Sequence, residues 1–365
     1  MKKIGNAFGG IGIGFVLIIV GIILLWWNEG NNVRNLKTTA EMDKSVIDVL
    51  SDSIDSSNEG KLIATHGKLI NEEELTDETF KVSIKTAKLE RIVEMYQWSE
   101  TSHTEDGDTT YTYNKEWSSS LIDSTHFSKS GYDNPSEMPF GSNSYFANDV
   151  RVGAFRLSSE QIGLLSTNGV YDTLNEENVT SLGYKVIGKY YTNSTDFNNP
   201  KVGDVRISFV YNNSTDISVL AVQTGNTFTD FVSKAGKSES RIMDGVQTGH
   251  EMINAIKNEN KILKWVLRVA GVLLTVGGFS SILKPISAIG GVIPLLGNVI
   301  QSMVGLISFI LGLAVSLVVI AIAWIRFRPL LGIALLAVVG VLIYFLYMKR
   351  KSNTNNTLNN SNVNN

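Results

Sequence analysis

Apolar residues are concentrated at the two ends of this chain. One uncharged apolar run covers Ile11–Trp27, and further apolar runs lie between Ile262 and Tyr347, whereas the residues between them are mostly polar. Runs of about 17 to 25 apolar residues are long enough to cross the hydrocarbon core of a bilayer as helices. The pattern therefore predicts an integral, multi-pass membrane protein with one large domain in water.

The ends of the apolar runs divide the chain into segments. The expected class is an α+β membrane protein with one N-terminal transmembrane helix, a large β-rich extramembrane domain with short helices, and three C-terminal transmembrane helices. The expected segments are an N-terminal lead and first transmembrane helix (1–27), a β-rich non-cytoplasmic domain (28–240), a basic helix running into the second transmembrane helix (241–283), an interfacial loop (284–298), a third (299–325) and a fourth (330–347) transmembrane helix, and a disordered basic, Asn-rich tail (348–365).

The first apolar run predicts an uncleaved signal anchor. It ends at Trp26 and Trp27, whose amphipathic rings favour the headgroup level, and no small-residue cleavage site follows. Small residues spaced by four near its entrance would let a second helix approach closely. A flexible glycine-rich lead-in explains them equally well. These helix-packing candidates are Gly5, Gly9, Gly10 and Gly14.

Alternation of apolar and polar residues predicts strands in the domain between the spans. A Ser-x-x-Gln pattern at Ser158–Gln161 predicts the start of a short helix, because it matches a capping box. No cysteine is present, so disulfides cannot stabilise the domain. The expected strands are Lys88–Trp98, Thr109–Trp117, Tyr184–Thr192, Asp204–Tyr211 and Ile217–Thr224.

A stripe of basic residues precedes the second span. Lys257, Lys261, Lys264 and Arg268 recur at i, i+4, i+7 and i+11, which places them on one helix face. Such a stripe would lie against anionic headgroups, with about 1 kcal/mol from each charge. Snorkelling of the long side chains at the end of a span explains the same pattern equally well.

Arg326 and Arg328 lie between the third and fourth predicted spans. Charges at this depth must stay near water or find partners, and the apolar runs contain no acidic residue. Headgroup phosphates are the expected partners, with Pro329 opening the last helix. The absence of a carboxylate relay in the apolar runs argues against a transporter.

Candidate chemistry is sparse, and we expect no enzyme, no cofactor and no metal site. His250-Glu251 begins a near match to a zinc-protease motif, but Asn254 replaces the second histidine. His103 and its acidic neighbours could collect a cation, although a solvated acidic turn is the simpler interpretation. Glu116 and Asp123 would suit general acid chemistry, but water or hydrogen bonds explain them as well. We expect no nucleic acid partner.

Many segments, in order along nearly the whole chain, resemble the LUMA family, also called the transmembrane protein 43 family. The arrangement of one span, a large domain and further spans agrees with that family as well. The matching segments are Trp26–Gly30, Gly60–Ile63 with His66-Gly67, Glu74–Asp77, Val93–Trp98, Thr110–Trp117, Ile122–Ser124, Asn134–Pro139, Gly203–Phe209, Lys234–Gly236 and Ala323–Leu330.

The resemblance implies scaffolding rather than catalysis. Members of that family are multi-pass proteins of the endoplasmic reticulum and inner nuclear membrane, with the large domain in the lumen. The resemblance implies that this chain likewise self-associates and organises nuclear-envelope complexes with emerin and lamins. Family members also occur in bacteria, where those partners do not follow and the location would be the plasma (inner) membrane. The expected partners are therefore membrane lipids, a second copy and other membrane proteins.

The sequence leaves one alternative for the membrane topology and one for the function. More Lys and Arg residues flank the spans on the domain side than on the other, which favours a cytoplasmic domain, whereas Lys2 and Lys3 before the first span and the resemblance favour a non-cytoplasmic one. The alternative to a scaffold is a membrane-anchored sensor or regulatory subunit. Its domain would bind a ligand and signal through a helix over 241–268.

Overall fold

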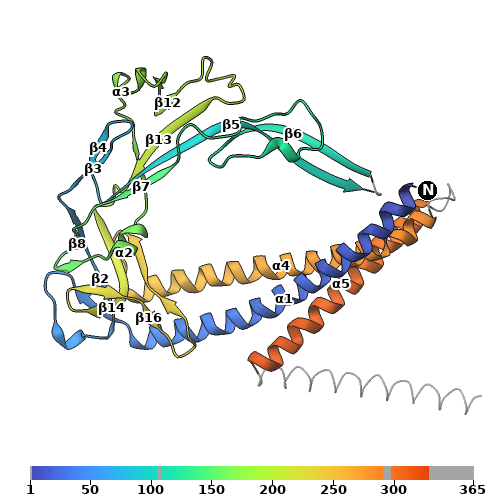
Figure 1. The fold of residues 1–365 in the computed structure, drawn as a ribbon. Helices are drawn as coiled ribbons and strands as arrows, with labels where there is room; N and C mark the ends of the chain where they lie inside the picture. The colour runs from blue at the N-terminus through green and yellow to red at the C-terminus, as the bar shows by residue number, and fades with distance from the viewer. Residues whose placement is uncertain (1, 106–107, 291–296, 329–365) are drawn as a thin grey trace, which may run out of the picture. The chain divides into compact units, whose positions relative to one another are not determined.

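The protein consists of two compact units (Figure 1). The computed structural model describes residues 2–105, 108–290 and 297–328. The membrane unit comprises residues up to Leu36 and from Asn258 onward, and the extramembrane unit comprises Lys37–Lys257. Within the described residues, three helices are long and apolar enough to cross a membrane. They are α1 (Lys2–Ser45), α4 (Gly249–Gly290) and α5 (Gly297–Phe327).

This layout matches the prediction of one N-terminal and three C-terminal spans only in part, because two C-terminal candidate spans lie within the described residues. The predicted fourth span (330–347) and the tail (348–365) lie outside the described residues. The predicted interfacial loop (284–298) is shorter in the structure, because α4 continues through Pro285 to Gly290 and α5 starts at Gly297. The loop prediction relied on Lys284-Pro285 as a helix breaker, but proline here is tolerated inside α4.

Both helices next to the extramembrane unit differ from their predicted bounds. Helix α1 continues 18 residues beyond Trp27 to Ser45, through a polar segment that the hydropathy criterion assigned to the β-rich domain. The basic helix predicted from residue 241 begins instead at Gly249, since Arg241–Asp244 forms strand β18. Strand β18 pairs with β14 (Asp216–Thr224), and this tertiary pairing determines its conformation.

Helices α1 and α4 pack antiparallel through glycines in the membrane unit. A methyl group added at Gly14 would lie 2.6 Å from the carbonyl oxygen of Gly278, and one added at Gly271 would lie 2.6 Å from Cγ of Leu25. A methyl group at Gly21 would meet Thr275 at 2.8 Å. Because lipid is as apolar as these side chains, close backbone approach rather than a hydrophobic effect drives such packing.

Helix α5 also packs on α4 in the antiparallel sense. A methyl group at Gly312 would meet Val276 at 2.6 Å. The hydroxyls of Thr275 and Ser316 are both fully buried and lie 2.7 Å apart. A hydrogen bond between hydroxyls in an apolar region fixes the rotation of one helix against the other.

The extramembrane unit contains two seven-stranded sheets. The first has the strand order β15-β14-β2-β8-β9, with β1 paired in parallel to β2 and β18 paired to β14. Its remaining strands are β1 (Ile47–Leu50), β2 (Leu62–Asn71), β8 (Val150–Val152), β9 (Phe155–Arg156) and β15 (Thr227–Thr229).

The second sheet has the order β11-β12-β13-β5-β6, with β10 paired to β13 and β7 paired to β5. Strands β5 and β6 form a long hairpin joined at Glu105 and Asp108, which continues well past β13 (Figure 1). The strands are β5 (Lys88–Glu105), β6 (Asp108–Ser118), β7 (Asn143–Phe146), β10 (Gly169–Tyr171), β11 (Lys185–Ile187), β12 (Tyr190–Thr192) and β13 (Val205–Tyr211).

Smaller elements complete the unit. They are the hairpin of β3 (Glu74–Asp77) and β4 (Val82–Lys85), the hairpin of β16 (Phe231–Val232) and β17 (Ser238–Glu239), the helices α2 (Ser159–Gly163) and α3 (Glu177–Thr180), and the 3₁₀ turns η1 (Ser56–Asn58) and η2 (Ser124–His126).

The predicted strands and the capped helix are confirmed, with one change. Helix α2 begins at the predicted capping box, in which the Gln161 N–H donates to the Ser158 hydroxyl at 3.3 Å and the Ser158 N–H donates to the Gln161 side chain at 2.9 Å. The segment Tyr184–Thr192, predicted as one strand, is instead the hairpin of β11 and β12. Gly188 has a φ of 58°, and its lack of a Cβ permits the turn there.

Two apolar clusters stabilise the extramembrane unit. The larger lies between the sheets and includes Phe80, Phe155, Tyr191 and Phe209, all fully buried. The smaller brings Met42 of α1 and the start of α4 against one face of β2 and β14. Its buried members are Met42, Leu62, Ala64, Leu220, Met252, Ile253 and Ile256. The two chain segments that leave this unit are therefore attached to the same sheet.

Asp77 is a fully buried carboxylate that is bonded to the larger cluster through Phe80. Its carboxylate pairs with Nη1 of Arg91 at 2.7 Å and accepts a hydrogen bond from the Tyr145 hydroxyl at 2.8 Å. It also accepts from the backbone N–H groups of Thr79 and Phe80, both at 3.0 Å. These bonds compensate the cost of burying the carboxylate and join β3 to β5 and β7.

Replacement of this carboxylate should destabilise the fold strongly. Asp77→Asn leaves Arg91 buried without a counter-charge, so we expect a loss of about 3 kcal/mol in the free energy of unfolding. Chemical denaturation of the full chain in detergent micelles, followed by circular dichroism, measures it. Glu78→Gln is the matched control, because Glu78 pairs with Lys81 in solvent and should cost almost nothing. Equal effects of the two substitutions would contradict the assignment.

Candidate membrane-interface site

Glu29 is a buried carboxylate in the membrane unit, with 1% of its surface exposed. Its Oε1 accepts a hydrogen bond from Nε of Arg268 at 2.6 Å, and its Oε2 accepts one from Nε1 of Trp324 at 2.9 Å. The three residues, here called the Glu29 cluster, come from α1, α4 and α5. One carboxylate therefore connects the three described helices of the membrane unit through charge-assisted hydrogen bonds.

Aromatic rings surround the cation of this cluster. The Arg268 guanidinium lies 4.9 Å from the ring centroid of Trp265 and 5.8 Å from that of Trp324. Only 13% of the Arg268 side chain is exposed. Arginine tolerates this site better than lysine, because its planar and weakly hydrated guanidinium stacks on rings while it donates to a carboxylate.

Buried asparagines continue the polar contact between α1 and α4. The Asn28 side chain donates to the backbone carbonyl of Lys264 at 3.1 Å, and the Asn35 side chain donates to Oδ1 of Asn260 at 2.5 Å. These contacts add polar links to the antiparallel packing of α1 on α4. They also explain why α1 stays helical beyond its apolar run, since α4 supplies partners for its polar side chains.

The residues of the predicted basic stripe belong to two units and have different contacts. Lys257, in the extramembrane unit, pairs with Asp43 at 3.2 Å. Arg268 belongs to the Glu29 cluster, whereas Lys261 is exposed and Lys264 is half-buried, 5.6 Å from the ring centroid of Trp265. In the part of the chain that the structure describes, Lys261 and Lys264 have no acidic hydrogen-bond partner.

The other interface candidates lie near the same end of the helices. Trp26 and Trp27 are 38% and 49% exposed, and Trp26 packs on Phe327 with ring centroids 5.5 Å apart. Arg326 is exposed, and its guanidinium lies 5.7 Å from the Phe327 ring centroid. Nη2 of Arg328 is buried and has no hydrogen-bond partner among the described residues. These residues and Lys264 mark one polar end of the membrane unit.

The glycine candidates divide into two groups. Gly14 lies at the close contact between α1 and α4, and a methyl group at Gly10 would make ordinary contact with Ser281 at 3.6 Å. The surroundings of Gly5 and Gly9 lie outside the described side chains. Hydropathy alone did not identify Gly21, Gly271 and Gly278, although they repeat at seven-residue intervals with Gly14 on the two helices.

The residues considered for catalysis have structural contacts. His250 contacts Oδ1 of Asp43 at 2.9 Å, and Glu251 accepts hydrogen bonds from the N–H and hydroxyl of Thr248 at the start of α4. Asp123 caps η2, and hydrogen bonds from the Thr125 hydroxyl and N–H hold its pKa below the ordinary value. Within the described residues, no group of three or more His, Cys, Asp or Glu is placed to hold a metal.

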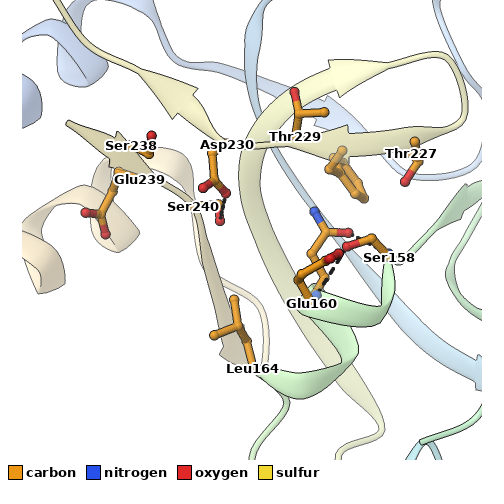
Figure 2. A pocket seen from close by; sticks show the side chains of 11 residues that line it. Ser158, Glu160, Leu164, Thr227, Thr229, Asp230, Ser238, Glu239 and Ser240 are labelled. Atoms are coloured by element: carbon orange, nitrogen blue, oxygen red, sulfur yellow. Dashed lines mark hydrogen bonds between the residues drawn. The ribbon is translucent and has the colours of Figure 1, made fainter. Parts of the chain in front are cut away.

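The extramembrane unit contains an open cleft of about 700 Å³. Its walls come from α2, β15 and β17, and Figure 2 shows Asp230 beside Ser240, whose hydroxyl donates to it at 2.5 Å. Hydroxyls and carboxylates predominate among the described lining residues, and none of those residues is basic. The lining residues are Ser158, Glu160, Gln161, Leu164, Thr227, Phe228, Thr229, Asp230, Ser238, Glu239 and Ser240.

Glu29 was missed as a site residue because it follows the first apolar run. The apolar run itself ends at Trp27 and contains no acidic residue, but α1 continues beyond it, and Glu29 on this continuation pairs with Arg268. A helical repeat of polar residues, Asn28, Asn32 and Asn35, was the available signal, because it predicts a polar face that a neighbouring helix must cover.

Comparisons with known proteins point to one family over most of the chain. The family model for transmembrane protein 43 matches residues 95–329. The human protein named transmembrane protein 43 is 30% identical over 94% of this chain and 91% of its own length, and the mouse protein is 29% identical over the same shares. The homolog from Drosophila melanogaster is 26% identical over 88% of this chain and 90% of its own length. No solved structure matches the chain.

Removal of the Glu29 charge alone, with Arg268 unchanged, should destabilise the membrane unit. Glu29→Gln leaves the Arg268 charge unpaired in an apolar environment, so we expect a loss of about 3 kcal/mol. SDS titration of the full chain in mixed micelles, with tryptophan fluorescence as the signal, measures the change. The double variant Glu29→Gln/Arg268→Gln should recover much of the loss, because it removes both charges. Simple addition of the two single effects would refute the pairing.

Proposed function

This chain belongs to the transmembrane protein 43 family, and on that premise we propose that it is a multi-pass membrane scaffold that self-associates and organises protein complexes at an internal or envelope membrane. It is an integral membrane protein with several candidate spans. In a eukaryote the proposed location is the endoplasmic reticulum and inner nuclear membrane, with emerin- and lamin-type partners. In a bacterium it is the plasma membrane, without them. We propose no catalytic role and no cofactor.

The observation that carries self-association is the free edge of the second sheet. Strand β6 is the last strand in that sheet, and among the described strands it pairs with β5 alone. Its length of 11 residues exceeds that of most strands in this protein. A long, open edge presents unpaired N–H and C=O groups that a strand of another chain can bind, and a second copy supplies such a strand.

The hydrogen bonds of β5 show which groups of β6 face outward. Trp98 directs both its N–H and its C=O away from β6, to the side chain of Asn134 at 2.7 and 2.9 Å. Its antiparallel partner Lys115 therefore belongs to a pair that exchanges no ladder hydrogen bonds, so the Lys115 N–H and C=O also face outward. Lys115 is exposed, and its N–H is available for another strand.

Removal of that single N–H should weaken self-association. Lys115→Pro keeps every ladder bond within the hairpin but deletes one outward donor from each copy. We expect the dimer dissociation constant to rise on the order of tenfold or more. Mass photometry of the full chain in lipid nanodiscs at graded dilution measures it. Lys115→Ala is the matched control, since it removes the side-chain charge but retains the N–H. If both variants associate like the unchanged protein, the edge is not the interface.

The proposed topology places the extramembrane unit on the non-cytoplasmic side. The chain lacks cysteine, so Ser142→Cys and Ser352→Cys each provide a unique label without background. In intact right-side-out vesicles of a bacterial host, an impermeant maleimide should label Ser142→Cys and leave Ser352→Cys unlabelled until the membrane is permeabilised. The reverse pattern would place the extramembrane unit in the cytoplasm.

A sensor or regulatory subunit is the second candidate, and the cleft favours it. Ser238, Glu239 and Ser240 line the cleft immediately before β18, which leads within a few residues to α4. A ligand bound there would contact the segment that precedes β18, which is followed along the chain by α4. Its acidic, hydroxyl-rich lining would suit a neutral or cationic ligand with several hydrogen-bonding groups. The helix available for such signalling begins at Gly249 rather than at residue 241.

A further inference from the structure

The membrane unit has an excess of positive charge at the end marked by the Glu29 cluster. Its sequence contains two acidic residues, Glu29 and Glu259, against a larger number of lysines and arginines. The two oxygens of Glu29 already accept hydrogen bonds from Arg268 and Trp324. Both oxygens of this carboxylate are therefore already engaged, one of them by the Arg268 charge.

Lys264 lies among other cations. It interacts electrostatically with Arg268, one helical turn later on α4, with Lys261 and Arg328, and with the anion Glu29. Lys264 is half-buried and lies beside the exposed ring of Trp265. Like charges that are partly removed from water repel one another strongly, so this arrangement favours an anion from outside the described chain.

Arg328 supplies an unpaired donor one helical turn after Trp324 of the Glu29 cluster. It follows α5 directly, where its N–H donates to the Trp324 carbonyl at 2.7 Å. Nη2 of its guanidinium is buried and has no hydrogen-bond partner among the described residues. A buried donor without an acceptor costs about 1 to 3 kcal/mol, more for a charged group. The same anion that relieves Lys264 would satisfy this donor.

We propose that Lys264 and Arg328 bind one phosphate group, with the Glu29 cluster holding Arg268 in place as the floor of the site. A guanidinium fork and an ammonium group are the usual ligands of phosphate oxygens. Exposed Trp27 and Trp265 mark the headgroup level on these helices, where lipid phosphates lie. The phosphodiester of an anionic lipid is therefore the first source to test, and free inorganic phosphate is the second.

Within the predicted basic stripe, the proposed site separates residues that are already paired with carboxylates from residues that can bind a phosphate. Lys257 pairs with Asp43 in the extramembrane unit and Arg268 pairs with Glu29, so neither is available to a lipid. Arg326 is exposed beside Phe327 and has the same charge as Arg328 two residues away. Arg326 is thus a matched control for a charge effect that depends on position rather than on net charge.

The test measures the Tm of the full chain in neutral detergent with no addition, with dioleoyl phosphatidylglycerol, or with inorganic phosphate. Without additions, Lys264→Gln and Arg328→Gln should have a Tm equal to or above that of the unchanged protein, because each removes a repulsive charge. The lipid should raise the Tm of the unchanged protein and of Arg326→Gln. For Lys264→Gln and Arg328→Gln, the apparent dissociation constant of the lipid, obtained from the Tm at graded lipid concentrations, should be about tenfold higher than for the unchanged protein.

Each outcome decides the proposal. The lipid pattern described above supports a lipid phosphate, and the same pattern with inorganic phosphate supports the site but assigns it a soluble ligand. If Arg328→Gln responds to both additions as the unchanged protein does, the proposal fails. It also fails if Arg328→Gln lowers the Tm without any addition, since Arg328 would then have only a structural role. Self-association through β6 is measured separately and does not affect this result.

Discussion

The ion pair between Glu29 and Arg268 is the interaction on which the membrane unit depends. A carboxylate and a guanidinium at this depth are costly individually, and each is acceptable only beside the other. Their pairing fixes the antiparallel register of α1 and α4, and the indole of Trp324 fixes α5 to the same carboxylate. The glycines allow the two backbones to approach closely, but small residues repeat along both helices and therefore permit more than one register. The Glu29–Arg268 pair selects one of these registers.

Close packing and polar satisfaction act together along these helices. Gly14 and Gly278 bring the backbones together in the apolar part, where Thr275 and Ser316 also exchange a hydrogen bond. Further along α1, toward the extramembrane unit, asparagines rather than glycines make the contacts with α4. Every residue from Asn28 to Val33 on α1 is buried. The change from small to polar contacts follows the expected change in environment from lipid to water.

The sequence predicted the parts of this protein whose pattern is local. The apolar runs, the alternating strands β5, β6, β13 and β14, and the capping box of α2 all follow from neighbouring residues. What it did not predict depends on distant partners. Strand β18 requires β14, the polar half of α1 requires α4, and the importance of Glu29 appears only when Arg268, 239 residues later, lies beside it. Of the interface site, the cations were identified from their spacing, but their division into paired and unpaired groups was not.

The attachment of the extramembrane unit has a consequence for how such a protein could arise. Within that unit the Gly249 N–H donates to Oδ1 of Asp48 at 2.7 Å, and His250 contacts Asp43, so the chain enters and leaves at adjacent points. An independently folded module with neighbouring ends can be inserted into a helical hairpin without separating its two arms. The two ends of the β-rich unit are therefore adjacent. Recombination could exchange a unit of this kind and leave the intramembrane contacts of α1 and α4 intact.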